Sequence, residues 1–332
     1  MLAWGFGALS APAAMSLAGL AWNRVLAGGV LAAMLLAVQA GLQRRTALPT
    51  AAACRAAFGR RASDLLLILT LIWLLLAAAD AAKLSEGIFE RGKGAEAAPA
   101  VLLALAALGS GKGTRACARA AGVWALLLAV LFGVVLAGAA SMIRVPWLAP
   151  WGAAEQIPQS AALLLAPSAL MYLQAAGAER RLLRRGLTAL ACGPAVLCAA
   201  VSGGLSPQVA AREPFALYTL TKSVSLLSVM QRFEALLSVG TMTGAYLLLT
   251  LLVCCAKNIV RLLAPRAENW APGAFCVLAF FGGEIVDRIP AAAWITGAAV
   301  FWGFLPALTQ WVVVRKKDGK NTKKGVDKSV SL

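Results

Sequence analysis

The chain has 332 residues, of which 61% are hydrophobic and 14% are charged, and its mean hydropathy is +0.78. This composition is typical of a polytopic membrane protein and excludes a soluble globular domain. Histidine is absent, which excludes histidine-ligated metals, histidine general bases and histidine pH switches. The seven cysteines are scattered and form no CxxC pair. We interpret them as buried thiols and expect no metal and no cofactor.

Ten apolar segments follow one another along the chain, and we expect each to form a transmembrane helix. They cover residues 2–21, 24–41, 64–83, 97–110, 120–143, 158–177, 187–204, 233–255, 270–287 and 290–314. The fourth segment is the weakest, because it is shorter than the roughly 20 residues that a perpendicular crossing needs. The first residues, Met1 to Trp4, include no basic residue, so we expect no cleavable signal peptide.

The net charge of +17 invites a nucleic-acid interpretation, but the distribution of the basic residues favours membrane topology. If the N-terminus is cytoplasmic, 22 of the 31 Lys and Arg residues fall on the cytoplasmic side, 8 fall outside, and Arg232 lies at a boundary. The positive-inside rule therefore fits ten spans with both termini in the cytoplasm. No nucleic-acid partner is needed to explain the charge.

We predict a single polytopic transmembrane domain over residues 1–314. The polar connection 205–231 is expected to form a short helix at the outer surface before the eighth span. The Lys-rich tail, 315–332, is predicted to be cytoplasmic and disordered. It could rest near anionic headgroups or serve only as a topology anchor, and the anchor is favoured.

The first and sixth spans are each interrupted by a proline with a serine nearby. The first runs from Gly5 through Gly7, Ala8 and Ser10 to Pro12, and the sixth contains Pro167, Ser168 and Ala169. Proline removes a helical hydrogen bond, and backbone freed at membrane depth is tolerated only beside protein or a wet cavity. The five-span offset is the one expected for two inverted repeats, about 1–143 and about 158–314, with a binding site at the breaks. The alternative is a pair of ordinary proline kinks.

The third span carries Asp80 close to its outer end, three residues before Lys83. An ion pair with Lys83 and a place in the lining of a site are both consistent with this spacing. Lys83 is also three residues from Glu86, and we interpret these two as a solvated pair at the interface. Glu284, Asp287 and Arg288 are read as a solvated turn between the ninth and tenth spans.

The eighth span opens with Arg232 and Glu234 and is apolar to Cys255. Glu234, Ser238 and Thr241 recur at helical spacing and make one polar stripe. Arg232 and Glu234 are two residues apart and do not face each other, so Arg232 is read as a surface anchor. Glu234 either lines a cavity or only benefits from the helix dipole at the start of its span.

No catalytic constellation is present, and we do not expect an enzyme. The chain has no Ser/His/Asp, metal-binding or paired-carboxylate arrangement. The stretch from Gly111 to Thr114 ends like a phosphate-binding loop but lacks the upstream glycine spacing and the preceding strand.

Several stretches together resemble the spore-germination receptor B-subunit permeases. They are Tyr218–Leu226 followed by Arg232-Phe233-Glu234-Ala235-Leu236, which is similar to the family's entry into the eighth span, and Phe58-Gly59-Arg60 with Lys83-Leu84-Ser85-Glu86 around the third. The order and spacing of the ten segments agree along nearly the whole chain. Two departures from the family stand out. The chain begins almost inside its first span. Its sixth span lacks the Gly-acid pair often seen in the family, so the resemblance implies no particular ligand specificity.

The resemblance implies the amino acid–polyamine–organocation transporter superfamily and its five-plus-five inverted-repeat (LeuT-like) fold. It implies a germinant-sensing subunit in the inner membrane of an endospore, in complex with a membrane-anchored A subunit and a C-subunit lipoprotein, with amino acids as the usual ligands. The ligand would lie between the broken spans one and six and the faces of spans three and eight. Tyr172 would form an aromatic wall there. A secondary transporter of amino acids or organic cations needs the same cavity and is the alternative.

Overall fold

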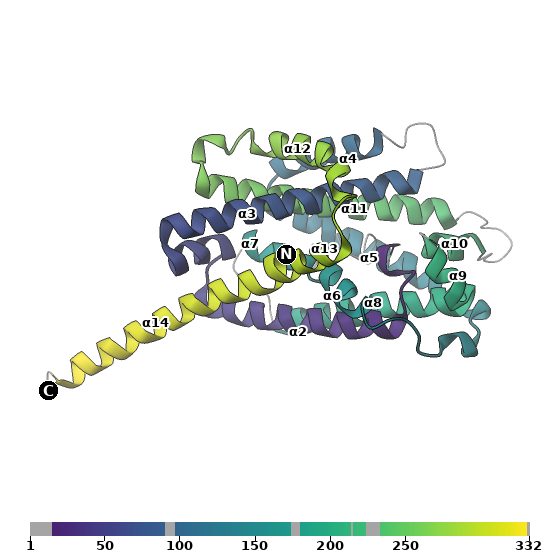
Figure 1. Ribbon diagram of the computed structural model, residues 1–332, viewed down its shortest axis with the longest axis horizontal. Helices are drawn as coiled ribbons and strands as arrows, with labels where there is room; N and C mark the ends of the chain where they lie inside the picture. The colour runs from purple at the N-terminus through teal and green to yellow at the C-terminus, as the bar shows by residue number, and fades with distance from the viewer. Residues whose placement is uncertain (1–14, 90–96, 174–179, 214, 224–232, 331–332) are drawn as a thin grey trace.

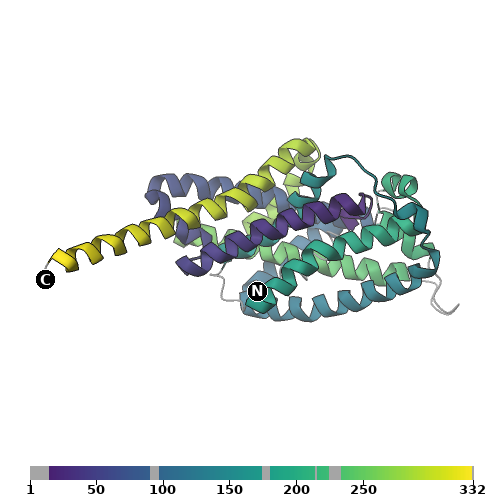
Figure 2. The same ribbon diagram turned by 90° about the horizontal axis from the view of Figure 1, so that it is seen from below.

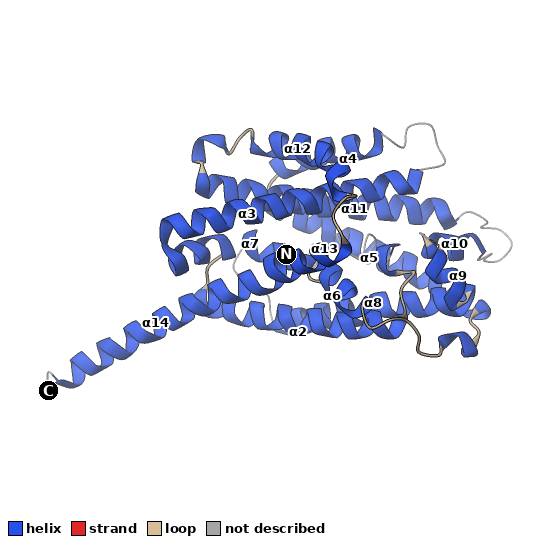
Figure 3. Cartoon of the chain, viewed as in Figure 1, coloured by secondary structure: helices blue, strands red, loops and turns tan. Residues whose placement is uncertain are grey.

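The computed structural model describes residues 15–89, 97–173, 180–213, 215–223 and 233–330. All the regular structure within these ranges is helical (Figure 3). The α-helices are α2 (Trp22–Thr46), α3 (Thr50–Phe89), α4 (Ala97–Gly111), α5 (Thr114–Ala139), α6 (Gln156–Leu164), α7 (Leu170–Leu173), α8 (Arg180–Leu205), α9 (Pro207–Arg212), α10 (Ala216–Ser223), α11 (Phe233–Leu263), α12 (Ala271–Val286), α13 (Ala291–Ala298) and α14 (Leu305–Val330). Two irregular segments matter below, the 3-10 helix η3 (Ala166–Ala169) and the π-helix η5 (Ala299–Phe304).

In the described part of the chain, six helices are long and apolar enough to cross a membrane. They cover Trp22–Thr46, Thr50–Glu86, Gly122–Met142, Arg185–Leu205, Leu237–Leu263 and Ala291–Asp318. Two shorter apolar helices, α4 and α12, have 15 and 16 residues. The chain is therefore an all-α membrane protein. The expected segments from 24–41 onward all coincide with helical structure, while most of the first segment lies outside the described residues.

The long helices run roughly along one axis and pack into a bundle (Figure 1). Helix α11 is the most buried of the six candidate spans, with 78% of its most apolar stretch inside the protein. Helix α2 packs against both α6 and α8. This close approach depends on two adjacent glycines, because a Cβ on Gly28 would lie 2.7 Å from the Ile157 carbonyl oxygen and one on Gly29 would lie 2.8 Å from that of Ala191.

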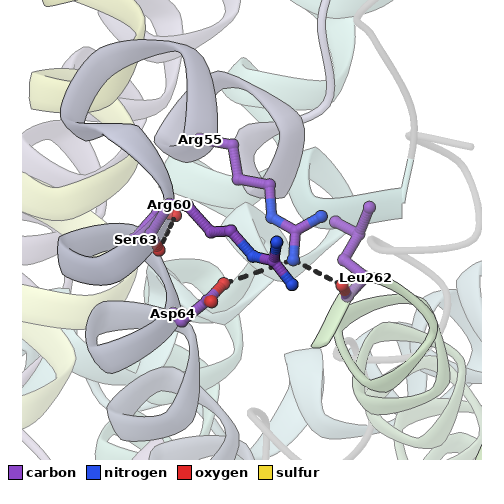
Figure 4. A network of polar contacts seen from close by, with 5 residues as sticks. All are labelled: Arg55, Arg60, Ser63, Asp64 and Leu262. Carbon is purple, nitrogen blue, oxygen red and sulfur yellow. Dashed lines mark hydrogen bonds and ion pairs between the residues drawn. The ribbon is translucent and has the colours of Figure 1, made fainter. Parts of the chain in front are cut away.

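A kink at Gly59 divides α3 and places its first turns beside the end of α11. Gly59 has φ +76° and ψ −179°, a conformation that is essentially restricted to glycine. The kink lets Arg55 reach Asp64, with 3.2 Å between Nη2 and Oδ1, and donate to the Leu262 carbonyl of α11 (Figure 4). The Arg55 side chain thus ties the third and eighth apolar segments together at one end of the bundle.

The last described helix, α14, extends well past the final apolar segment. It continues as one helix to Val330 and projects from the bundle (Figure 1). Lysine has a high helix propensity, and extending an existing helix adds one hydrogen bond for each residue fixed. At its base, Lys316 donates to the Ala57 carbonyl at 2.7 Å and Lys317 to the Thr46 carbonyl at 2.9 Å. The described part of the polar connection 205–231, up to residue 223, contains two short helices, α9 and α10.

Candidate functional site

A cavity of about 260 Å³ lies next to the break in the sixth apolar segment, and two of its lining residues, Ser16 and Asp80, are exposed. Its wall is built by residues from helices α3, α6, α11 and α13, from the irregular segments η3 and η5, and by a residue just before α2. The lining residues are Ser16, Ala77, Asp80, Ala81, Lys83, Leu84, Leu163, Ala166, Leu248, Leu252, Trp294 and Trp302. The first, third, sixth, eighth and tenth apolar segments therefore all contribute to one cavity.

Asp80 supplies the negative charge of this cavity. Ala77, Asp80, Ala81 and Leu84 recur at helical spacing, so one face of α3 borders the cavity. Within the described residues Asp80 has no hydrogen bond and no ion pair. Lys83 pairs instead with Asp287, at the end of α12.

The pairing of Lys83 corrects the sequence interpretation of this region. Glu86 was expected to pair with Lys83. Asp287 is an exposed turn residue, as expected, but it also pairs with Lys83. The Lys83–Asp287 ion pair joins positions 204 residues apart, which spacing along one helix could not indicate.

Trp294 and Trp302 line the cavity, and Trp73 packs against both of them and against Phe301. Trp73 stands at the centre, with ring centroids 4.9 Å from Trp294, 5.7 Å from Phe301 and 5.4 Å from Trp302. These separations are in the favourable range for aromatic pairs. The cluster closes over Gly297, where an added Cβ would lie within 2.8 Å of three carbon atoms of the Trp73 ring. The missing side chain at Gly297 thus lets Trp73 brace the two tryptophans that line the cavity.

The π-helix η5 leaves backbone carbonyls that other helices satisfy. The Gln39 side chain of α2 donates from Nε2 to the Trp302 carbonyl at 2.7 Å and to the Gly303 carbonyl at 2.6 Å. The Tyr172 hydroxyl donates to the Phe301 carbonyl at 3.1 Å. Tyr172 is 1% exposed and is not among the lining residues, so the structure places it behind η5 rather than on the cavity wall, where it was predicted.

The break expected at Pro167 is present. Helix α6 ends at Leu164, and η3 carries Pro167, Ser168 and Ala169, all buried. Side chains from α2 and α11 satisfy the carbonyls beyond the break. Gln43 donates to Met171 O at 3.0 Å, Cys255 to Ala169 O at 3.1 Å and Asn258 to Tyr172 O at 2.7 Å. The Ser168 hydroxyl is buried without a hydrogen-bond partner, and Ala166, at the start of η3, is the residue of this segment that lines the cavity.

The other predicted ligand residues have varied positions. Gly7, Ala8 and Ser10 lie outside the described residues, as does the side chain of Glu234. Thr241 is buried and donates to the Leu237 carbonyl of its own helix at 2.8 Å, and Ser238 is half-buried. If the predicted stripe on α11 is continued at the same helical spacing, it reaches Leu248 and Leu252. These two residues line the cavity. Of the seven predicted residues whose side chains the structure describes, Asp80 is the one that lies on the cavity wall.

Sequence reasoning missed the aromatic wall and the glutamines behind it. Six of the ten tryptophans lie near the ends of apolar segments, where an aromatic belt is expected, and Trp73, Trp294 and Trp302 are among the other four. A mid-span tryptophan is the signal that could have found them. Gln39 and Gln43 were also detectable, because two amides at i and i+4, at the end of an apolar span and just after it, form a polar stripe of the kind read on the eighth span.

The cavity presents groups suited to a small amine-bearing ligand. A carboxylate and indole faces both attract an ammonium group, the first by ion pairing and the second by the cation–π interaction. The Trp302 Nε1–H is buried without an acceptor in the described structure, so it is an available donor. Leucines from α6 and α11 provide an apolar surface. A molecule with an ammonium group, a hydrogen-bond acceptor and a short apolar part matches this set.

No known family model matches the chain, and no curated protein matches it as a relative.

Proposed function

We propose that the protein is the membrane subunit of a spore nutrient-germinant receptor that binds a small amine-bearing molecule, with amino acids as the first class to test. The proposal combines the sequence resemblance with one structural observation, the cavity that joins Asp80 to Trp294 and Trp302 beside the break at Pro167. The ten apolar segments would form a five-plus-five inverted repeat, and the cavity borders segments from both halves. Binding would favour one arrangement of the bundle and transmit that preference to the A and C subunits.

The cavity itself is tested by ligand binding to the purified protein in detergent. A panel of amino acids and simple amines is screened by the shift that each causes in thermal unfolding, since a ligand at about 100 times its Kd adds about 2.7 kcal/mol. Asp80→Asn keeps the shape but removes the charge, and the loss of a charge-assisted hydrogen bond is expected to weaken binding by about 10- to 100-fold.

Asp64→Asn is the matched control for this experiment. It is the same substitution on the same helix, but Asp64 pairs with Arg55 away from the cavity (Figure 4). The control should bind like the parent protein. Equal binding by Asp80→Asn and the parent would reject the cavity as the ligand site.

The secondary transporter remains the rival, and two measurements separate it from the receptor. The protein in proteoliposomes is supplied with the labelled ligand found in the screen, and a receptor should give no more uptake than empty vesicles. Co-expression with A- and C-type subunits should recover a complex whose stability responds to the ligand. Sustained uptake without any complex would favour the transporter.

Glu234→Gln tests the predicted role of the eighth span. It should alter the response to the ligand while leaving assembly of the complex intact.

A further inference from the structure

A second hollow, larger than the cavity and on another face of α6, lies between α5 and α8. It has a volume of about 510 Å³, and its thirteen lining residues are all Ala, Gly, Leu, Phe, Pro, Val or Cys. Small residues open it on both sides, with Ala125, Ala129 and Gly133 on α5 and Gly193 on α8. An added Cβ at Gly133 or Gly193 would meet no atom within 4 Å, which confirms that the space is open. We call this hollow the α5–α8 groove.

The groove is about as long as one leaflet of a bilayer is thick. Its lining on α5 runs from Ala125 to Leu136, about 17 Å at the helical rise of 1.5 Å per residue. This is about half of the roughly 30 Å hydrocarbon thickness. Both helices belong to candidate membrane spans, so the groove meets the acyl chains of lipids. A single acyl chain fits a long, narrow and wholly apolar hollow of this kind.

Basic residues gather at one end of the groove. Figure 2 shows α5 (blue) and α8 (green-teal) side by side with their first residues at the same end. The exposed Arg119 lies about 9 Å along α5 from the groove, and the exposed Arg185 about 6 Å along α8. Neither helix contains an acidic residue, and Lys112, just before α5, is also exposed. This end would hold a negatively charged headgroup.

We propose that the α5–α8 groove is a binding site for an anionic phospholipid of the cytoplasmic leaflet. An acyl chain lies in the groove and the phosphate lies between the basic starts of α5 and α8. Basic pockets between transmembrane helices on the cytoplasmic side are known binding places for anionic headgroups. Small residues also let two transmembrane helices pack closely, so a second transmembrane helix is the alternative occupant of the groove. The basic residues favour the lipid, since a neutral helix would gain nothing from them. The proposal concerns a site apart from the ligand cavity and does not depend on the proposed function.

The test is native mass spectrometry of the detergent-solubilised full chain with added phosphatidylglycerol or phosphatidylcholine carrying the same acyl chains. The parent protein should retain phosphatidylglycerol in preference to phosphatidylcholine. Gly133→Phe, which fills the groove, should lose the retained lipid, and Gly193→Leu should do the same from α8. Arg119→Gln and Arg185→Gln should each lower the affinity for phosphatidylglycerol by about fivefold, with little effect on phosphatidylcholine.

Gly41→Phe is the matched control, because Gly41 is an exposed glycine of α2 that also has no atom within 4 Å and lies outside the groove. It should retain phosphatidylglycerol like the parent protein. Equal retention of the two lipids by the parent, or unchanged phosphatidylglycerol in both groove-filling variants, would overturn the proposal. So would a co-purifying protein that the groove-filling variants release while they keep the lipid, because the groove would then be a helix-docking site.

Discussion

Gly297→Ala tests whether the aromatic wall depends on one missing side chain. The new Cβ would fall within 2.8 Å of three carbons of the Trp73 ring, so Trp73 must move. The ring is 6% exposed and packs against Trp294, Phe301 and Trp302, so it has no free space to enter. Overpacking of this kind costs about 1–3 kcal/mol. It is offset by about 1 kcal/mol, because alanine is a better helix former than glycine.

Gly41→Ala isolates the second of these effects. Gly41 is exposed within α2 and meets no atom within 4 Å, so alanine there should gain the helix propensity without any clash. Gly297→Ala should therefore be less stable than Gly41→Ala by about 1–3 kcal/mol. In thermal unfolding at a fixed scan rate, this is a difference of about 2–6 °C.

Near-ultraviolet circular dichroism reports the coupled tryptophans and should change in Gly297→Ala but not in Gly41→Ala. Ligand binding should also weaken in Gly297→Ala, because Trp294 and Trp302 line the cavity. If Gly297→Ala melts at or above the temperature of Gly41→Ala and keeps the parent spectrum, the packing of Trp73 over Gly297 is not as described.

Three further predictions follow from the structure. Gln39→Leu leaves two buried carbonyls of the η5 region without a donor, so it should lower the melting temperature by the equivalent of about 1–3 kcal/mol for each carbonyl; an unchanged melting temperature would contradict the bonding. Tyr172→Phe removes a single hydrogen bond to the same segment and should cost about 1 kcal/mol, so finding it more damaging than Gln39→Leu would reverse the expected order. Cys192 is exposed and the other six cysteines are buried, so a membrane-permeant maleimide should add one label to the folded protein and seven after unfolding, counted by mass spectrometry; a second label on the folded chain would contradict the burial.

The helical membrane architecture was predictable because hydropathy is a property of the sequence alone. Segment positions follow from runs of apolar residues, and the break at Pro167 follows from the chemistry of one residue. The extension of α14 to Val330 is less evident from hydropathy, because the tail is polar. Lysine is a good helix former, and these residues continue a helix that already exists at Leu305.

The site was predictable only in part, because its walls come from segments far apart in the chain. Asp80 was predicted as a site residue because a carboxylate in an apolar span is energetically costly and therefore indicates a functional role. Trp73 and Gly297 could not be paired by inspection, because neither residue is unusual alone and they meet only in the packed bundle. Tyr172 was assigned to the cavity because it follows the break closely, yet the geometry of α7 turns it toward the Phe301 carbonyl.

The cavity beside Asp80 and the α5–α8 groove are separated by the end of α6. Leu163 lines the cavity and the next residue, Leu164, lines the groove, both at the end of α6 where the helix stops before η3. A ligand that shifts this last turn must alter the shape of the groove, and a lipid chain packed on Leu164 must resist or favour that shift. Coupling between two binding sites is reciprocal. Phosphatidylglycerol should therefore change the affinity for the ligand by the same factor by which the ligand changes the affinity for phosphatidylglycerol. Gly133→Phe should abolish the effect of phosphatidylglycerol on the ligand affinity while leaving the ligand bound. Equal ligand affinity of the parent protein with and without the lipid would mean that the end of α6 is rigid and that the two sites act independently.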